Sequence, residues 1–151
     1  MRIQTKTRRI KEVAAETDTT RRLQTMPGVG PIVARAVEAF APAMASFRRG
    51  RDFAAWLGLV PRQHSGGKER PERVSKAGQA DIRQLLIIGA MSRLSRLGRR
   101  SITEGSWLDR MLARKPKMLV AIALANKMAR AIRAMLTKGE DYSDPALIAA
   151  A

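Results

Sequence analysis

The sequence predicts an all-α fold, in which a small helical domain contains a glycine hairpin between two helices and one long basic loop. Of the 151 residues, 45% are hydrophobic but only 4% are aromatic, so the core must consist mainly of aliphatic side chains, Met and Ala. Apolar residues recur every three or four positions in several segments, which is the period of an amphipathic helix. Glycine and proline gather between those segments and mark turns.

The first half of the chain predicts three helical segments. Residues 2–24 are polar and charged with few apolar positions, which indicates an exposed helix or the end of a longer one. Residues 25–31 contain two glycines and two prolines and predict a turn, with Pro31 at the first position of the next helix. That helix ends at Pro42, and a shorter one lies within residues 47–59. The apolar face predicted after the turn is Ile32, Val33, Ala36, Val37 and Phe40.

The second half predicts the long basic loop and three further helices. Residues 60–78 lack periodicity and contain three glycines and two prolines, which predicts a loop. Helices are expected over residues 79–97, over 108–113, and from Pro116 to about Thr137 with Gly139 as its C-cap residue. The last helix has its predicted apolar positions at Leu119, Ile122, Ala125, Ala129, Ile132 and Leu136, and it carries Lys127, Arg130 and Arg133 on its polar side.

The net charge is the strongest indication of a partner. Lys and Arg total 29 against 13 acidic residues, which gives a formal charge of +16. Such an excess opposes compaction unless a polyanion neutralises it, and nucleic acid is the commonest polyanion, followed by an anionic membrane surface. Arg outnumbers Lys, and its planar guanidinium suits phosphates and guanine edges. A solvated basic surface without a partner is the alternative.

Composition and spacing exclude several classes of site. The chain has no cysteine and a single histidine, His64, which excludes disulfides, cysteine–zinc sites and histidine-rich metal sites. No apolar run is long enough to cross a bilayer, and the first residues form no signal sequence, so we expect no membrane partner and a cytoplasmic location. Asp52, Asp81 and Asp109 belong to separate helical contexts, and their spacing predicts no metal site.

The hairpin at residues 25–31 resembles a helix-hairpin-helix. Gly28 and Gly30 let the backbone turn tightly and approach a phosphate without a Cβ in the way. The first amides of the following helix have no partner within the helix, and the helix dipole adds positive potential there. The pattern predicts binding to the phosphate backbone without base preference. An ordinary helix–helix turn that uses glycine is the alternative.

The long loop carries a second candidate site, centred on Ser65. Gly66 and Gly67 permit close approach of a substrate, Lys68 suits a phosphate oxygen, and a serine hydroxyl attacks phosphorus once its proton affinity is lowered. His64 is adjacent, but neighbours in an extended chain point apart, so it is a weak candidate for the base. From these residues alone, the favoured interpretation is a basic loop that grips phosphate, with Ser65 as a hydrogen-bond donor. The other cations assigned to nucleic acid here are Arg62, Arg70, Arg73 and Lys76.

An ordered set of motifs resembles one protein family. The motifs are residues 26–34 (MPGVGPIVA), 53–62 (FAAWLGLVPR), 65–70 (SGGKER), 74–78 (VSKAG), 82–86 (IRQLL) and 117–127 (KMLVAIALANK). Together they resemble the C-terminal transposase domain of the DEDD-type, bridge-RNA-guided insertion-sequence transposases. Each motif alone is unspecific, whereas the ordered set is highly specific and extends over nearly the whole chain.

The resemblance implies a function and a set of partners. It implies a DNA transposase in which Ser65 is the nucleophile for strand cleavage and rejoining, with Gly66, Gly67 and Lys68 around it and with Gly28 and Gly30 as the hairpin. It also implies a structured guide RNA, a homo-oligomer, and Mg²⁺ bound by four acidic residues of a separate N-terminal RNase H-like domain. Family members commonly have a second hydroxyl residue before the glycine pair, and the loop of this chain is one residue shorter.

This resemblance divides the chain into three parts. Residues 1–22 correspond to the end of a coiled-coil or linker helix, residues 23–140 to the helical transposase domain, and residues 141–151 to a frayed tail. The acidic domain is not found in the sequence, so we expect no metal site in this chain and no strand cleavage by the chain alone. A non-catalytic DNA- or RNA-binding hairpin module is the alternative, and the ordered motifs argue against a third candidate, a basic structural protein of a ribonucleoprotein.

Overall fold

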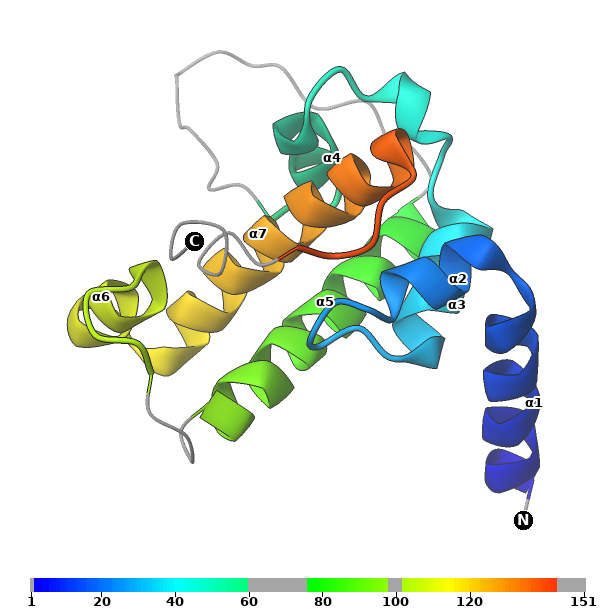
Figure 1. The fold of residues 1–151 in the computed structure, drawn as a ribbon, viewed down its shortest axis with the longest axis horizontal. Helices are drawn as coiled ribbons and strands as arrows, with labels where there is room; N and C mark the ends of the chain where they lie inside the picture. The colour runs from blue at the N-terminus through cyan, green and yellow to red at the C-terminus, as the bar shows by residue number, and fades with distance from the viewer. Residues whose placement is uncertain (1, 60–75, 98–101, 144–151) are drawn as a thin grey trace.

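The computed structural model describes residues 2–59, 76–97 and 102–143, and all secondary structure in these ranges is helical, which confirms the predicted all-α class. In chain order the elements are α1 (Arg2–Glu16), α2 (Asp18–Leu23), α3 (Pro31–Phe40), the short 3₁₀ helix η1 (Met44–Ser46), α4 (Gly50–Trp56), α5 (Lys76–Leu97), α6 (Trp107–Arg114) and α7 (Lys117–Lys138) (Figure 1).

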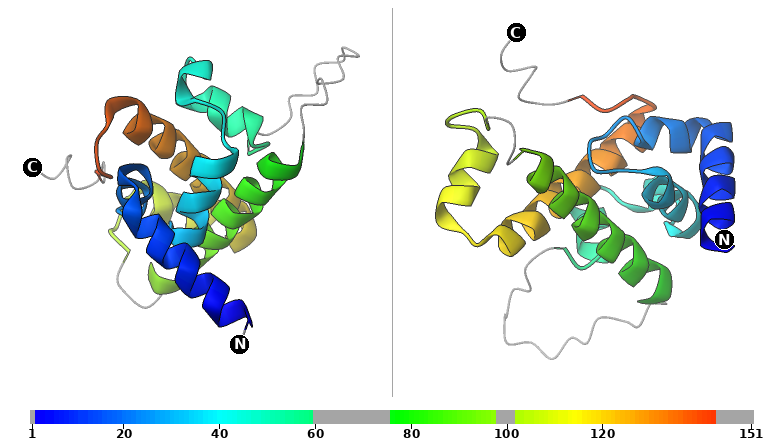
Figure 2. Two further views of the ribbon diagram at one scale, coloured as in Figure 1. Left: turned by 90° about the vertical axis from the view of Figure 1, so that its right-hand side faces the viewer. Right: turned by 90° about the horizontal axis from the view of Figure 1, so that it is seen from below.

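The two longest helices, α5 and α7, form the centre of the fold and lie side by side in antiparallel directions (Figure 1). α3 packs on α5 and the short α4 packs on α7, so each helix of the pair has a second partner. α2 contacts both α3 and α7, whereas α1 projects from this body beside α3 (Figure 2). α6 lies against the beginning of α7, at the end of the molecule away from α1. Among the helices in the described ranges, none is both long and apolar enough to span a membrane.

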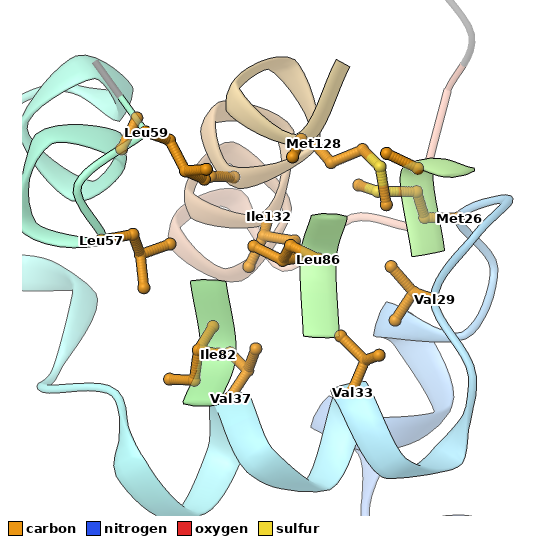
Figure 3. Packing of buried hydrophobic residues seen from close by; sticks show 14 of the residues in the cluster. Met26, Val29, Val33, Val37, Leu57, Leu59, Ile82, Leu86, Met128 and Ile132 are labelled. Carbon is orange, nitrogen blue, oxygen red and sulfur yellow. The ribbon is translucent and has the colours of Figure 1, made fainter. Parts of the chain in front are cut away.

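Aliphatic side chains from four helical regions meet in one core (Figure 3). Leu86 of α5 and Ile132 of α7 have no exposed surface, and Val37 of α3 and Leu57 at the end of α4 pack into the same cluster. Full burial of each such side chain contributes about 1.5–3 kcal/mol. The core therefore consists mainly of aliphatic residues and methionine, as the low aromatic content predicts.

Two of the predicted apolar faces are partly wrong. Ile32 and Phe40 are 48% and 57% exposed, although their spacing predicts both on the buried face of α3. Leu119 of α7 is also half exposed, at 50%. The residues that α7 buries are Val120, Ala121, Leu124, Ala125, Met128, Ala129, Ile132 and Met135. Periodicity identifies an amphipathic helix, but its neighbours decide which flank is covered, and α7 is covered by both α4 and α5.

The helix ends follow the local sequence. The single helix expected over residues 2–24 is divided at Thr17, whose hydroxyl accepts a hydrogen bond from the Thr20 amide at 3.3 Å and caps α2. Pro31 begins α3, as predicted. Gly139 ends α7 in the left-handed region at φ +68°, which confirms it as the C-cap residue.

Candidate nucleic-acid interface

The hairpin between α2 and α3 is a compact turn fixed to the core. The Met26 amide donates to the Leu23 carbonyl oxygen at 3.2 Å, and the Val29 amide donates to the Met26 carbonyl oxygen at 3.1 Å. The side chains of all three residues are buried. Gly28 lies within this turn at φ +91°, a conformation that residues with a side chain rarely adopt. The turn is therefore held by hydrogen bonds, by packing and by one left-handed glycine.

Gly28 makes a close backbone contact with Gly89 of α5. A Cβ on Gly28 would lie 2.9 Å from the Gly89 carbonyl oxygen and 3.1 Å from Cε of Met128. A Cβ on Gly89 would in turn overlap the carbonyl oxygen of Gly28. Each glycine thus permits the approach of the other, and the pair sets the position of the hairpin against α5 and α7. The absence of a side chain at Gly28 has this packing reason, independent of any ligand.

Gly30 is the hairpin glycine that faces open space. It is the N-cap residue of α3, and a Cβ built on it has no heavy atom within 4 Å. Pro31 has no amide hydrogen, so the amides of Ile32 and Val33 are the first donors of α3 without a partner inside the helix. The positive end of the helix therefore lies at an open turn, and phosphate binding there stays a prediction.

The second predicted site lies outside the described residues. This applies to Arg62, Ser65, Gly66, Gly67, Lys68, Arg70 and Arg73, and Lys76 is described only by its place as the first residue of α5. The chain enters this segment at Leu59, which is buried. The side-chain amide of Asn126 in α7 donates to the Leu59 carbonyl oxygen at 3.2 Å. Leu59, the last described residue before the segment, is thus attached to α7.

The aspartates predicted to be separate are separate in the fold. Asp52 accepts a hydrogen bond from the Arg49 amide at 3.0 Å, and Asp109 accepts one from the Gly105 amide at 2.9 Å, so both cap helices. Asp81 lines a hollow between α3 and α5. Within the ranges that the structure describes, no three His, Cys, Asp or Glu side chains are placed to hold a metal ion. These residues do not fit a magnesium site.

The ion pairs are concentrated at one end of the molecule. The pairs found among the described residues are Arg8–Glu12, Arg21–Asp18, Arg22–Asp18, Arg35–Glu38 and Arg21–Asp141. A hydrogen bond from Arg22, followed by one from Arg21, holds the pKa of Asp18 below its ordinary value. By contrast, no described carboxylate pairs with the cations of α4, α6 or α7. Within the described ranges these cations therefore form no salt bridge, and they outnumber Asp52 and Asp109, the carboxylates of α4 and α6.

Arg133 attaches the chain before α4 to α7. Its Nη2 atom donates to the carbonyl oxygens of Phe47 and Arg48, each at 2.8 Å. Hydrogen bonds from a charged donor are stronger than neutral ones, so this side chain fixes the approach of α4. The side chains of Arg48 and Arg49 remain exposed beside it.

Lys127 joins α7 to α6. Its ammonium group lies 4.0 Å from the centre of the Trp107 ring, which is a cation–π contact. Partial burial lowers the pKa of Lys127, and the neighbouring charges of Arg130 and Arg110 lower it further. Three cations from two helices therefore lie close enough to repel one another.

Sequence reasoning grouped the basic residues of α7 but missed Arg48, Arg49 and Arg110. The signal available for Arg110 was the lack of an acidic residue three or four positions away. Lys127 and Arg130 share this lack, whereas the paired arginines of α1, α2 and α3 each have such a neighbour.

The fold and the charge define a small, strongly basic, all-helical domain. Residues 20–104 match the Transposase IS116/IS110/IS902 family. The chain belongs to this family, which confirms the transposase part of the resemblance found in the sequence.

Curated relatives agree with this assignment. The chain is 47% identical over 122 residues to a probable family 20 transposase of Pseudomonas aeruginosa, an alignment that covers 80% of the chain and 36% of the relative. It is 39% identical over 134 residues to the transposase for insertion sequence element IS1111A of Coxiella burnetii, over 88% of the chain and 37% of the relative. It is 37% identical over 137 residues to the transposase for insertion sequence element IS1328 of Yersinia enterocolitica, over 90% of the chain and 41% of the relative. The chain thus aligns with about two fifths or less of each relative.

Proposed function

We propose that this chain is the DNA-binding part of an insertion-sequence transposase and that it supplies Ser65 as the nucleophile of strand cleavage and rejoining. The observation that carries the proposal is membership of a transposase family by a chain with a formal charge of +16. The cations of α4, α6 and α7, which form no salt bridge within the described ranges, support DNA as the partner. The residues assigned to the phosphate backbone are Gly28, Gly30, Arg62, Gly66, Gly67, Lys68, Arg70, Arg73 and Lys76.

The proposed chemistry is a transfer of a phosphoryl group to serine. The Ser65 oxygen loses its proton and forms a bond to phosphorus, while the bond from phosphorus to the deoxyribose oxygen of the leaving strand breaks. That oxygen takes up a proton, and the strand end stays linked to the protein as a phosphodiester. Attack by a second strand hydroxyl reverses the sequence and rejoins the DNA. Basic side chains assist by neutralising the charge that develops on the phosphoryl oxygens.

The resemblance also implies partners that the proposal includes. A homo-oligomer or a separate acidic domain supplies the carboxylates for Mg²⁺, and a structured RNA directs the choice of DNA. Because the described residues do not fit the metal, no step of the chemistry above is routed through it. We expect no strand cleavage by this chain alone.

An adduct assay tests the nucleophile. The chain is mixed with DNA, Mg²⁺ and a full-length family member whose own serine is replaced by alanine, and covalent protein–DNA adducts are separated on denaturing gels. We expect an adduct with this chain and none with its Ser65→Ala variant. An adduct that persists in Ser65→Ala overturns the assignment of this serine. DNA binding without any adduct favours the second candidate, a non-catalytic hairpin module.

A charge placed on the open hairpin glycine tests the hairpin. Asp and Ser are both good N-cap residues, so Gly30→Asp and Gly30→Ser should keep the stability of α3. Only Gly30→Asp places a negative charge beside the bound phosphate, and it should weaken DNA binding at least fivefold relative to Gly30→Ser. Equal affinities of the two variants would mean that the hairpin is only a turn.

A further inference from the structure

One surface gathers exposed or partly exposed cations from three elements of the fold. Lys127 and Arg130 lie three positions apart on α7, so they share one side of that helix. Arg110 of α6 adds a third cation, because the Trp107 ring of the same helix contacts Lys127. The two residues that precede α4, Arg48 and its N-cap residue Arg49, add two more. We name these five residues the basic ridge.

Backbone contacts fix the parts of the basic ridge relative to one another. A Cβ on Gly50, the first residue of α4, would lie 3.2 Å from Cα of Arg130, so Arg49 is held directly beside α7. The hydrogen bonds of Arg133 to the carbonyl oxygens of Phe47 and Arg48 hold the same segment. Figure 1 shows α6 and α4 on the same central helix, α7. Contacts of the backbone therefore hold the parts of the ridge in place, in addition to its long and flexible side chains.

No described carboxylate forms a salt bridge with the basic ridge. Asp52 lines one hollow with Arg48 and Arg49, and Asp109 lies beside Arg110 in the sequence. Both aspartates accept backbone amide hydrogens and keep their charge, so the five cations of the ridge outnumber the two carboxylates near them. Partial burial, followed by the charges of Arg130 and Arg110, lowers the pKa of Lys127, so the charged form carries a cost in the free protein. A ligand that brings negative charge to this place relieves that cost.

We propose that the basic ridge binds the sugar–phosphate backbone of duplex DNA, as a surface separate from the hairpin. The inference rests on the proposed function and adds a binding site to it. Residues three positions apart on a helix have Cβ atoms about 5–6 Å apart, and the side chains of Lys127 and Arg130 are both long. Lys127 and Arg130 can therefore reach neighbouring phosphates of one strand, while the arginines before α4 and on α6 extend the contact. Four of the five cations are arginines, whose planar guanidinium groups suit phosphate oxygens.

The choice of DNA over other polyanions follows from the family. The relatives are transposases of insertion sequence elements, which are DNA. The five residues of the ridge are all cations. Among the exposed large apolar residues, Ile32, Phe40 and Ile88 lie on α3 and α5, and two others, Met118 and Leu119, lie at the beginning of α7. A lipid surface is therefore an alternative ligand that the test includes. RNA and anionic vesicles serve as comparison ligands in the test.

The test is the salt dependence of binding to a duplex of about 30 base pairs. The variant Lys127→Gln/Arg130→Gln removes two charges and the contact of Lys127 with the Trp107 ring, which contributes only about 0.5–1 kcal/mol. The protein should therefore stay folded, with unchanged helical circular dichroism. On duplex DNA the slope of log K against log salt is smaller by about 0.9 for each phosphate that the protein no longer neutralises. We therefore expect a slope smaller by about 2 and an affinity at least tenfold lower at moderate salt.

A matched control separates the ridge from net charge. Arg8→Gln/Arg21→Gln also removes two charges, but from arginines that already have carboxylate partners. It should leave the slope within about 0.5 of the unmodified protein, which is well below the change of about 0.9 per neutralised phosphate. Equal slopes for the two double variants overturn the proposal while leaving DNA binding itself intact. A protein that does not bind DNA before substitution refutes the proposed function instead.

Tryptophan fluorescence gives a second readout at the site. In a Trp56→Phe background, Trp107 is the only tryptophan, and its ring lies under the Lys127 ammonium group. Saturation with duplex DNA should change its emission, because phosphate contact alters the position and field of that ammonium group. Unchanged emission at saturation contradicts contact at the ridge. Tighter, ridge-dependent binding of double-stranded RNA or anionic vesicles than of DNA overturns the assignment of DNA as the ligand.

Discussion

The contact between Gly28 and Gly89 makes a sharp prediction, because helix propensity and packing have opposite effects there. Gly89 lies inside α5, where alanine is favoured over glycine by about 0.8–1 kcal/mol in an open helix. Propensity alone therefore predicts that Gly89→Ala stabilises the protein. The added Cβ would, however, lie 3.2 Å from the carbonyl carbon of Gly28 and overlap its oxygen. The obstacle is backbone, which cannot turn away as a flexible side chain can.

We expect packing to outweigh propensity at Gly89. The hairpin must shift away from α5, and Met26 and Val29 must shift with it, although both are buried. Overpacking of a filled interior costs about 1–3 kcal/mol, which exceeds the gain from propensity. The net loss should be up to about 2 kcal/mol in the free energy of unfolding. For a domain of this size that corresponds to a fall in Tm of up to about 8 °C.

Urea denaturation and thermal unfolding measure this effect directly. Gly30→Ser is the matched control, because it adds a side chain to the other hairpin glycine, where there is open space. Its free energy of unfolding should change by less than about 0.5 kcal/mol or increase, since serine is a good N-cap residue. If Gly89→Ala raises the Tm, the close approach of the hairpin to α5 is refuted.

Three further predictions concern α7. Arg133→Met leaves two carbonyl oxygens without their charged donor and should lower the free energy of unfolding by about 1–3 kcal/mol, and an unchanged urea midpoint would contradict this role. Gly139→Ala forces a side chain into φ +68° and should destabilise by about 1–2 kcal/mol, whereas Gly139→Asn should lose less in the same thermal melt. The pKa of Lys127 is lower folded than unfolded, so the free energy of unfolding should rise with pH between the lowered pKa and the ordinary 10.5. Lys127→Met should lack this rise when both proteins are unfolded in urea across that range.

Local features of the fold could be predicted from the sequence because nearby residues decide them. Pro31 begins a helix and Gly139 ends one by virtue of their own backbone preferences. Phe40 and Leu119 were misplaced because burial depends on which helices pack against a given flank. The packing reason for Gly28 could not be predicted, since it requires Gly89, which is distant in the sequence.

The candidate site likewise has some features that the sequence predicts and others that depend on packing between distant segments. The sign and size of the charge follow from composition, and so does the expectation of a polyanionic partner. The placement of Arg110 beside Lys127 depends on how α6 packs against α7, and no local sequence pattern specifies that packing. The missing acidic neighbours of these residues nevertheless marked them as unpaired. A search for cations without a partner at helical spacing would have identified part of the basic ridge from the sequence.

The hairpin and the basic ridge are connected through one helix. Met128 of α7 lies beside Gly28 of the hairpin, and Lys127, the preceding residue, belongs to the ridge. Because α7 is continuous and packs along α5, the two surfaces belong to one packed body. A DNA duplex that contacts both then binds a preorganised surface, without the ordering cost that a flexible connection imposes.

This connection predicts how binding depends on duplex length. On about 30 base pairs, the reductions in binding free energy caused by Gly30→Asp and by Lys127→Gln/Arg130→Gln should add, because the two sites contact the same molecule without contacting each other. On a duplex of about 10 base pairs, one helical turn, either surface can hold the DNA alone, so each change should cost less than on the long duplex. Reductions that are equal on both lengths would mean that the two surfaces do not share one DNA molecule, and that the ridge and the hairpin serve different strands or different duplexes.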